Sequence, residues 1–359
     1  MLADGQKREL RARTSKLPMT HDSSAARSDL RIPAINLFLS SERDRGRLEA
    51  VSDRVAWKHG DAELLNVLDA GVEILFAKAP PPAEAAPNLQ WLQVSSAGVD
   101  YLAGSAPWAR GLEVTTARGV YAVPMAEYIM TALLSASQRV GDRRELQARK
   151  EWPSSYIDYE CYGLRGKTLV IVGYGGVGRE TARLASTFGM RIIAIKAKPS
   201  ERVGYSYREP GSGDPDGVLP DEIFGLDQIA QAFQQADYVA LTLPLTSGSR
   251  GLVDRRLLGL LRPGAWIVNV SRGPIIDESS LIDALRDRRI GGAWLDVFET
   301  EPLPRASPLW DLPNVVVTPH VSGGNRDSFT VLTDLCCENI RRYVAGEPLL
   351  NRVDPEKGY

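Results

Sequence analysis

A glycine-rich turn between an apolar run and a helical pattern constrains the fold of this chain more than any other feature. Residues 170–178 read Val-Ile-Val-Gly-Tyr-Gly-Gly-Val-Gly, which contains the spacing G-x-G-x-x-G. The first glycine of such a turn permits a tight bend, the second lets the backbone approach a pyrophosphate, and the third lets the helix pack closely on the strand. The positive end of the helix then faces the phosphates. The turn predicts a dinucleotide site formed by Gly173, Gly175, Gly176, Val177 and Gly178.

Near-continuous apolar runs around this turn predict a parallel sheet. Six such runs are separated by helical stretches, and they begin at residues 167, 190, 238, 265, 292 and 315. Strands that are covered on both faces lack the polar alternation of a half-exposed strand, and parallel sheets are built from them. We therefore predict a doubly wound α/β domain. Shorter β-rich runs near residues 31, 72, 89 and 112 predict a smaller α/β unit before it.

The second apolar run ends in lysine, which bears on the choice of cofactor. An acidic residue at this point usually holds the ribose 2′-hydroxyl of NAD. No acid occurs between Met190 and Ser200, whereas Lys196, Lys198 and Arg202 cluster where a 2′-phosphate would lie. The pattern favours NADP over NAD. NAD held by the backbone alone, with the three cations solvated, stays open as the alternative.

Three polar segments follow the late apolar runs, at residues 269–273, 296–302 and 318–320. Ligands of α/β sheets bind at these carboxyl ends. The imidazole of His320 can exchange a proton near neutral pH, and the carboxylate of Glu301 can stabilise its protonated form. Arg272 is costly to bury unless it meets an anion, so it is a candidate for binding the carboxylate and keto oxygen of an acid substrate. Taken alone, His320 could equally be a buried histidine that caps a strand.

These motifs, taken in order, resemble those of the D-isomer-specific 2-hydroxyacid dehydrogenase family. The glycine turn is followed by N-x-S-R-G, D-V-F-x-x-E-P and T-P-H, and the resemblance covers about residues 31–345. It implies an oxidoreductase that transfers a hydride between NAD(P)(H) and C2 of a small D-2-hydroxy acid or 2-keto acid. It also implies that Arg272, Glu301 and His320 form the catalytic set.

The same resemblance implies further site residues. Asp296 would hold the nicotinamide side of the cofactor, and the amides of Ala97 and Gly98 would face the substrate carboxylate. The other cofactor contacts that it implies are Leu243, Pro244, Val270, His320 and Gly323.

The family topology implies two Rossmann-like domains. A doubly wound dinucleotide-binding domain (residues 125–319) would be inserted into a smaller flavodoxin-like substrate domain (residues 31–124 and 320–348), with the active site in the cleft between them. The polar residues 1–30 are expected to be a disordered leader. The Pro/Gly-rich residues 199–220 are expected to form a surface loop.

Composition limits the partners. The formal net charge of −2 gives no general attraction to nucleic acid or to an anionic membrane, and no apolar run approaches the roughly 18 residues of a membrane span. Three cysteines, two of them adjacent, suit neither a disulfide framework nor a metal site and fit the cytoplasm. We expect a small-molecule 2-keto or 2-hydroxy acid as the ligand and a homodimer formed through the cofactor domain.

Two other functions stay open. A formate or phosphite dehydrogenase resembles this family, but formate enzymes of that group carry Gln where this chain has Glu301. A dinucleotide-sensing binding protein, like the transcriptional corepressors that share the fold, would bind NAD(H) with little turnover. Such a sensor could keep the same catalytic set, so sustained turnover of 2-keto acids is what distinguishes the enzyme from it.

Overall fold

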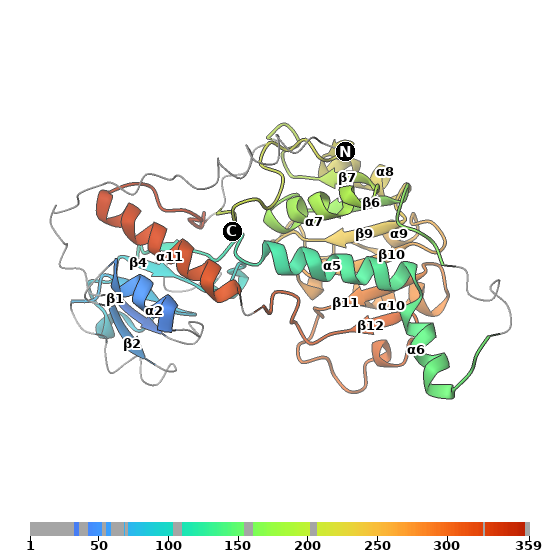
Figure 1. The fold of residues 1–359 in the computed structure, drawn as a ribbon, viewed down its shortest axis with the longest axis horizontal. Helices are drawn as coiled ribbons and strands as arrows, with labels where there is room; N and C mark the ends of the chain where they lie inside the picture. Colours follow the sequence, from blue (N-terminus) through green and yellow to red (C-terminus); the bar gives the residue numbers. More distant parts are fainter. Residues whose placement is uncertain are drawn as a thin grey trace, which may run out of the picture.

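The computed structural model of the chain describes residues 32–35, 42–51, 55–58, 68, 71–102, 110–153, 161–201, 207–325 and 327–355. The predicted leader at residues 1–30 and Arg202 lie outside the described residues. Within the described residues the named strands form two sheets, and every pairing between them is parallel (Figure 1). The predicted α/β class with parallel sheets is confirmed.

The larger sheet has seven described strands in the order β12-β11-β10-β9-β6-β7-β8. The order reverses at β6, which pairs with β7 on one side and with β9 on the other. Doubly wound sheets bind ligands at such a reversal, outside the carboxyl ends of the strands. The strands are β6 (Thr168–Val172), β7 (Arg191–Ile195), β8 (Glu222–Phe224), β9 (Tyr238–Leu241), β10 (Trp266–Asn269), β11 (Gly292–Leu295) and β12 (Val315–Val317).

Both faces of the larger sheet are covered, which explains why its strands read as continuous apolar runs. Val170 and Val172 of β6 pack into one core, whereas Leu169 and Ile171 pack into the core on the opposite face. Helices α8 (Ile229–Phe233), α9 (Arg255–Leu258) and α10 (Glu278–Arg286) cover the first core. Helices α5 (Ala122–Ser137) and α7 (Gly176–Thr187) cover the second.

The smaller sheet has the order β2-β1-β3-β4-β5 and is covered by helices from both halves of the sequence. Figure 1 shows α11 (Ser328–Ala345), near the end of the chain, beside α2 (Glu42–Glu49), near its start. Leu48 of α2 and Leu335 of α11 share a core with Trp91. The predicted domain boundaries remain a proposal. The strands are β1 (Ile32–Ile35), β2 (Val55–Lys58), β3 (Ile74–Phe76), β4 (Trp91–Gln93) and β5 (Glu113–Thr115).

Three elements were not predicted from the sequence, each for a physical reason. The apolar runs at the edge strands β2 and β8 are only three and two residues long, so they are too short to show a period. Helix α6 (Val140–Arg149) has no buried residue along its fully described length, so it lacks an apolar face to recognise.

None of the helices in the described part of the chain is long and apolar enough to cross a membrane. The 3-10 helices are η1 (Ala83–Ala85), η2 (Asp100–Leu102), η4 (Leu226–Gln228), η5 (Gly273–Ile275) and η6 (Pro308–Trp310).

The segment 199–220, expected to be a surface loop, is partly buried where it is described. Asp214 is 2% exposed, and its carboxylate accepts hydrogen bonds from the Tyr174 hydroxyl (2.7 Å) and from two amides of its own loop (both 3.1 Å). The amide of Gly213 donates to Glu180 of α7 (2.5 Å). The surface expectation was wrong around Asp214, because these bonds compensate the burial of the carboxylate.

The segment after α11 returns to the loop that follows β5. Asn351 donates from Nδ2 to the carbonyl oxygens of Thr116 (3.0 Å) and Arg118 (2.7 Å), and its Oδ1 accepts from the amide of Tyr207 (2.9 Å). Gly119 has φ 90°, and a Cβ there would lie 1.9 Å from the Tyr207 carbonyl oxygen. Three segments far apart in the sequence therefore meet at this loop, and only glycine fits their contact.

Candidate active site

The glycine turn has the geometry of a pyrophosphate cradle. Gly173 has φ 103°, and a Cβ there would lie 2.7 Å from the amide nitrogen of Leu243. A Cβ on Gly178 would lie 2.3 Å from the carbonyl oxygen of Gly173. At Gly175, by contrast, no described atom lies within 4 Å of the Cβ position. The first and third glycines thus permit tight packing, while the second leaves open space beside the N-terminus of α7, where a phosphate fits.

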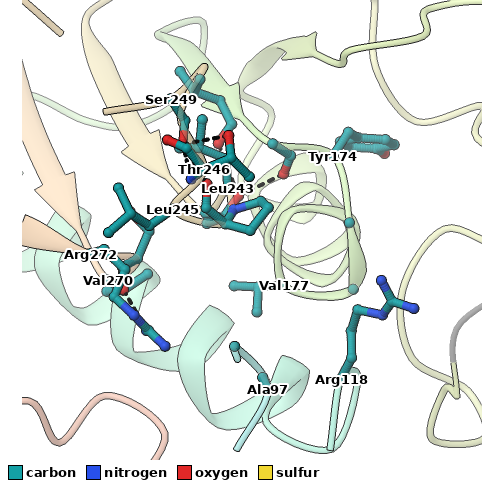
Figure 2. A pocket seen from close by; sticks show the side chains of 18 of the residues that line it. Ala97, Arg118, Tyr174, Val177, Leu243, Leu245, Thr246, Ser249, Val270 and Arg272 are labelled. Carbon is teal, nitrogen blue, oxygen red and sulfur yellow. Dashed lines mark hydrogen bonds between the residues drawn. The ribbon is translucent and has the colours of Figure 1, made fainter. Parts of the chain in front are cut away.

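A cavity of about 440 Å³ lies beside this turn, at the carboxyl ends of β6, β7, β9 and β10. Loops of the smaller sheet supply its other wall. In the view of Figure 2, the side chains of Arg272 and Arg118 extend from opposite sides of the pocket, with Val177 between them. The predicted site residues that line the cavity are Ala97, Gly98, Gly173, Gly175, Gly176, Val177, Lys196, Leu243, Pro244, Val270 and Arg272.

Six predicted site residues are absent from the described lining of this cavity. Gly178 faces the packed side of the turn, and Lys198 forms an exposed ion pair with Glu201 (2.9 Å). Gly323 lies behind the wall, where a Cβ would be 3.5 Å from the ring of Tyr121, a lining residue. The other three, Asp296, Glu301 and His320, lie in the segments after β11 and β12.

Of the cations predicted to meet a 2′-phosphate, Lys196 lies in the cavity wall, whereas Lys198 is absent from the described lining. Its ammonium donates a hydrogen bond to the carbonyl oxygen of Glu201. Burial lowers the pKa of Lys196, and the nearby charge of Arg179 acts in the same direction. The strand that should end in an acid for NAD therefore ends in a cation at the cavity.

His320 and Glu301 form a close pair. His320 Nδ1 lies 2.8 Å from Glu301 Oε2, and the other carboxylate oxygen accepts the amide of Phe298 (3.0 Å). With Glu301 fixed by its backbone partner, Nδ1 is the imidazole nitrogen that carries a proton toward it. Both side chains are exposed to at least 36%. The second ring nitrogen, Nε2, has no hydrogen-bond partner among the described residues.

Arg272 is brought to the loop that contains Ala97 and Gly98. Its Nε and Nη2 both lie 3.1 Å from Asp100 Oδ1, and Nη1 donates to the carbonyl oxygen of Ser271 (2.9 Å). Asp100 therefore provides an anionic partner within the protein, whereas the sequence predicted the substrate carboxylate as the anion at Arg272. Since the guanidinium has five N–H donors, it can hold Asp100 and still bind a second carboxylate.

Asp296 is completely buried and holds the turn that carries His320. Its carboxylate accepts hydrogen bonds from the Thr318 hydroxyl (2.6 Å) and from the amides of Val321 (2.9 Å) and Ser322 (2.8 Å). Its carbonyl oxygen accepts the amide of His320 (2.9 Å). The role at the nicotinamide that the resemblance implies for Asp296 remains a prediction.

Sequence reasoning missed several residues of the cavity wall. Asp100 lies two residues after Gly98, and Tyr174 lies between two glycines of the glycine turn. Because both positions are next to predicted site residues, both could have been predicted to line the cavity. Arg118 precedes α5 and reaches the cavity only because the two sheets lie side by side. The pairing of Arg272 with Asp100 joins residues 172 positions apart, which no local pattern reveals.

Comparison with known proteins gives a consistent family resemblance. Residues 130–322 match the model of the NAD-binding domain of D-isomer specific 2-hydroxyacid dehydrogenases. A glyoxylate reductase of Korarchaeum cryptofilum is 32% identical over 278 residues, which cover 76% of this chain and 78% of that protein. A glycerate dehydrogenase of Methylorubrum extorquens is 28% identical over 288 residues, which cover 77% of this chain and 84% of that protein.

Solved structures agree with the fold. A D-isomer specific 2-hydroxyacid dehydrogenase from Xanthobacter autotrophicus, in complex with NADPH and MES, aligns with a TM-score of 0.75 at 27% identity. The alignment covers 92% of this chain and 100% of that one. The two proteins therefore share the same fold.

Proposed function

Because the chain belongs to the D-isomer-specific 2-hydroxyacid dehydrogenase family, we propose that it interconverts a small 2-keto acid and a D-2-hydroxy acid with His320 as acid/base. It is an NAD(P)-dependent oxidoreductase that acts on a CH–OH group. The pair between His320 Nδ1 and Glu301 Oε2, at 2.8 Å, carries the assignment of the acid/base. A carboxylate at this distance holds the imidazole by its Nδ1 side and leaves Nε2 for proton exchange with the substrate.

Each of the site residues has a separate role in the reduction of a keto acid. A nicotinamide dinucleotide, held at the glycine turn, would supply the hydride. His320 donates the Nε2 proton to the oxygen on C2, which becomes the hydroxyl group, and Glu301 holds the imidazole in place. Arg272 binds the substrate carboxylate, together with the amides of Ala97 and Gly98. In the oxidative direction neutral His320 takes up the hydroxyl proton.

The cofactor contacts follow from the cavity wall. The glycine turn would hold the pyrophosphate, and Leu243, Pro244 and Val270 would line the remainder of the cofactor site. We propose a preference for NADP over NAD, because Lys196 stands in the wall where an acid would bind the ribose of NAD. The complex of the Xanthobacter autotrophicus relative with NADPH supports this preference.

The substrate class is proposed from the family relatives and from the site. Relatives are named glyoxylate, hydroxypyruvate and glycerate enzymes, all of which act on short acids. Wild-type enzyme and His320→Asn should be assayed with glyoxylate, hydroxypyruvate and pyruvate, using NADH and NADPH in parallel. We expect sustained wild-type turnover, faster with NADPH, and a loss of about 10²- to 10⁴-fold in kcat for the variant.

The affinity of the variant for cofactor, followed by nicotinamide fluorescence, should stay near that of the wild type. Near-normal turnover by His320→Asn would show that another group is the acid/base. Tight cofactor binding by the wild type, with no turnover on any acid, would instead identify a dinucleotide sensor.

We also propose that the protein is a homodimer that associates through the larger-sheet part of the chain. Three exposed apolar side chains occur on α5, on α6 and in the segment after α6: Leu134, Val140 and Trp152 are 36%, 41% and 95% exposed. Burial of such side chains against a second copy would remove apolar surface from water. The cytoplasmic location expected from the cysteines remains a prediction.

A further inference from the structure

A line of hydrogen bonds joins helix α5 to the segment that carries His320. The indole Nε1 of Trp294 donates to the Tyr128 hydroxyl oxygen (2.7 Å). The Tyr128 hydroxyl is hydrogen-bonded to the Thr318 hydroxyl. The Thr318 hydroxyl donates to Asp296 Oδ1 (2.6 Å). Tyr128 lies on α5, whereas the other three residues lie on β11 or just after β11 and β12.

The chemistry of the four groups permits only one direction for these bonds. An indole N–H can only donate, and a carboxylate can only accept. The single Thr318 proton is directed at Asp296, so the Tyr128 proton must be directed at Thr318. Burial raises the pKa of the Tyr128 phenol, which keeps that proton on the oxygen at neutral pH. Aligned bonds of this kind polarise and strengthen one another.

Asp296, which accepts the last hydrogen bond of this line, also binds the backbone around His320. Asp296 binds the amides of Val321 and Ser322 through its side chain and the amide of His320 through its carbonyl oxygen. His320 itself has φ 55°, a left-handed conformation that is uncommon for a residue other than glycine. Such a conformation persists only where its surroundings hold it. The orientation of the Asp296 carboxylate therefore bears directly on where the imidazole points.

We propose that Tyr128 is a positioning residue for His320, which it holds through Thr318 and Asp296 in the orientation that meets Glu301. The inference rests on the proposed role of His320 as acid/base. Residues Ala122 and Met125 at the start of the same helix line the cavity. Helix α5 is thus one rigid element that contacts both the cavity and the acid/base segment.

Tyr128→Phe tests this inference, because it removes one oxygen and keeps the ring that packs edge-on against Trp294 (6.2 Å between centroids). We expect kcat to fall roughly three- to tenfold, the effect of one lost hydrogen bond, and the pH profile of kcat to shift. KM for NADPH should stay within about twofold. Tyr343→Phe is the matched control, since it also loses a hydroxyl bond, to Gln90 (3.1 Å), while its ring stays stacked on Trp91.

Substitutions at Tyr128 and Thr318 should affect activity through the same line of hydrogen bonds. Thr318→Ser keeps a hydroxyl and should retain more activity than Thr318→Val. Combining Tyr128→Phe with Thr318→Val should cost little more than Thr318→Val alone, because both remove the same constraint. Fully additive losses would contradict a shared path.

A second measurement does not depend on turnover. The ring signals of His320 can be assigned in a histidine-labelled NMR spectrum by their loss in His320→Asn, and then followed with pH. Tyr128→Phe should move these signals or their titration, and Tyr343→Phe should not. Unchanged His320 signals in Tyr128→Phe would overturn the inference whatever the kinetics show. An inactive wild type would contradict the proposed function, while the NMR comparison would still decide the role of Tyr128.

Discussion

Single residues at the substrate end of the cavity are closely fitted to one another. A Cβ on Gly98 would come within 2.4 Å of Arg272 Nη2. Because that atom is the far end of a flexible side chain, Gly98→Ala should fold normally and displace the guanidinium. We expect KM for the keto acid to rise about tenfold, as one charge-assisted hydrogen bond is lost. Steady-state kinetics with saturating NADPH measures the change.

Gly163→Ala, a substitution at an unobstructed glycine, is the control for Gly98→Ala. No described atom lies within 4 Å of a Cβ on Gly163, so Gly163→Ala should keep the wild-type KM. If Gly98→Ala also kept it, Arg272 would not bind the substrate carboxylate.

At the scale of elements, α7 and the segment around Asp214 stabilise each other. Burial acts to raise the pKa of Asp214, but hydrogen bonds from Tyr174 and two loop amides, together with the charge of Arg179, outweigh it and lower the pKa. A carboxyl group with a lowered folded-state pKa contributes stability above its ordinary pKa of about 4, and this contribution is lost as the pH falls through the folded value. Asp214→Asn should therefore destabilise the protein by about 1–3 kcal/mol at pH 7.

Thermal unfolding of Asp214→Asn and wild type over a range of pH checks this sign. The difference in Tm should be largest at neutral pH and should shrink below about pH 4. Asp216→Asn, an exposed change in the same loop, should show little difference at any pH. A difference for Asp214→Asn that does not vary with pH would mean that the charge of the carboxylate contributes nothing.

At the scale of the whole molecule, the sequence predicted those features that depend on residues adjacent in the chain. Strands covered on both faces leave continuous apolar runs, so β6, β7 and β9 to β12 were recognisable. The pairing of His320 with Glu301 was predicted from the chemistry of the two side chains and from the family resemblance, and the two groups lie 2.8 Å apart. The ion pair of Arg272 with Asp100 and the contribution of Arg118 to the cavity depend on the packing of one sheet beside the other. Such contacts have no local signature.

The proposed dimer gives a prediction for the assembled molecule. Trp152 is 95% exposed, so in a dimer through this face Trp152→Ser should weaken association by removing buried apolar area. Sedimentation analysis should give twice the 39.3 kDa chain mass for the wild type and a lower average mass for the variant at micromolar concentration. Trp310→Ser, which changes a tryptophan 52% exposed elsewhere, is the control. A monomeric wild type would contradict the proposal.

The hydrogen bonds of Asn351 connect the segment after α11 to the wall of the cavity. Asn351 holds the carbonyl oxygen of Arg118, a residue of the cavity wall 233 positions earlier. A shortened gene product that stops before residue 349 would keep every strand and helix named above, yet it would lose the hydrogen bonds from Asn351 to this loop. Weak cofactor binding in such a product would resemble a defect of the glycine turn, although the lost residues lie about 170 positions further along the chain.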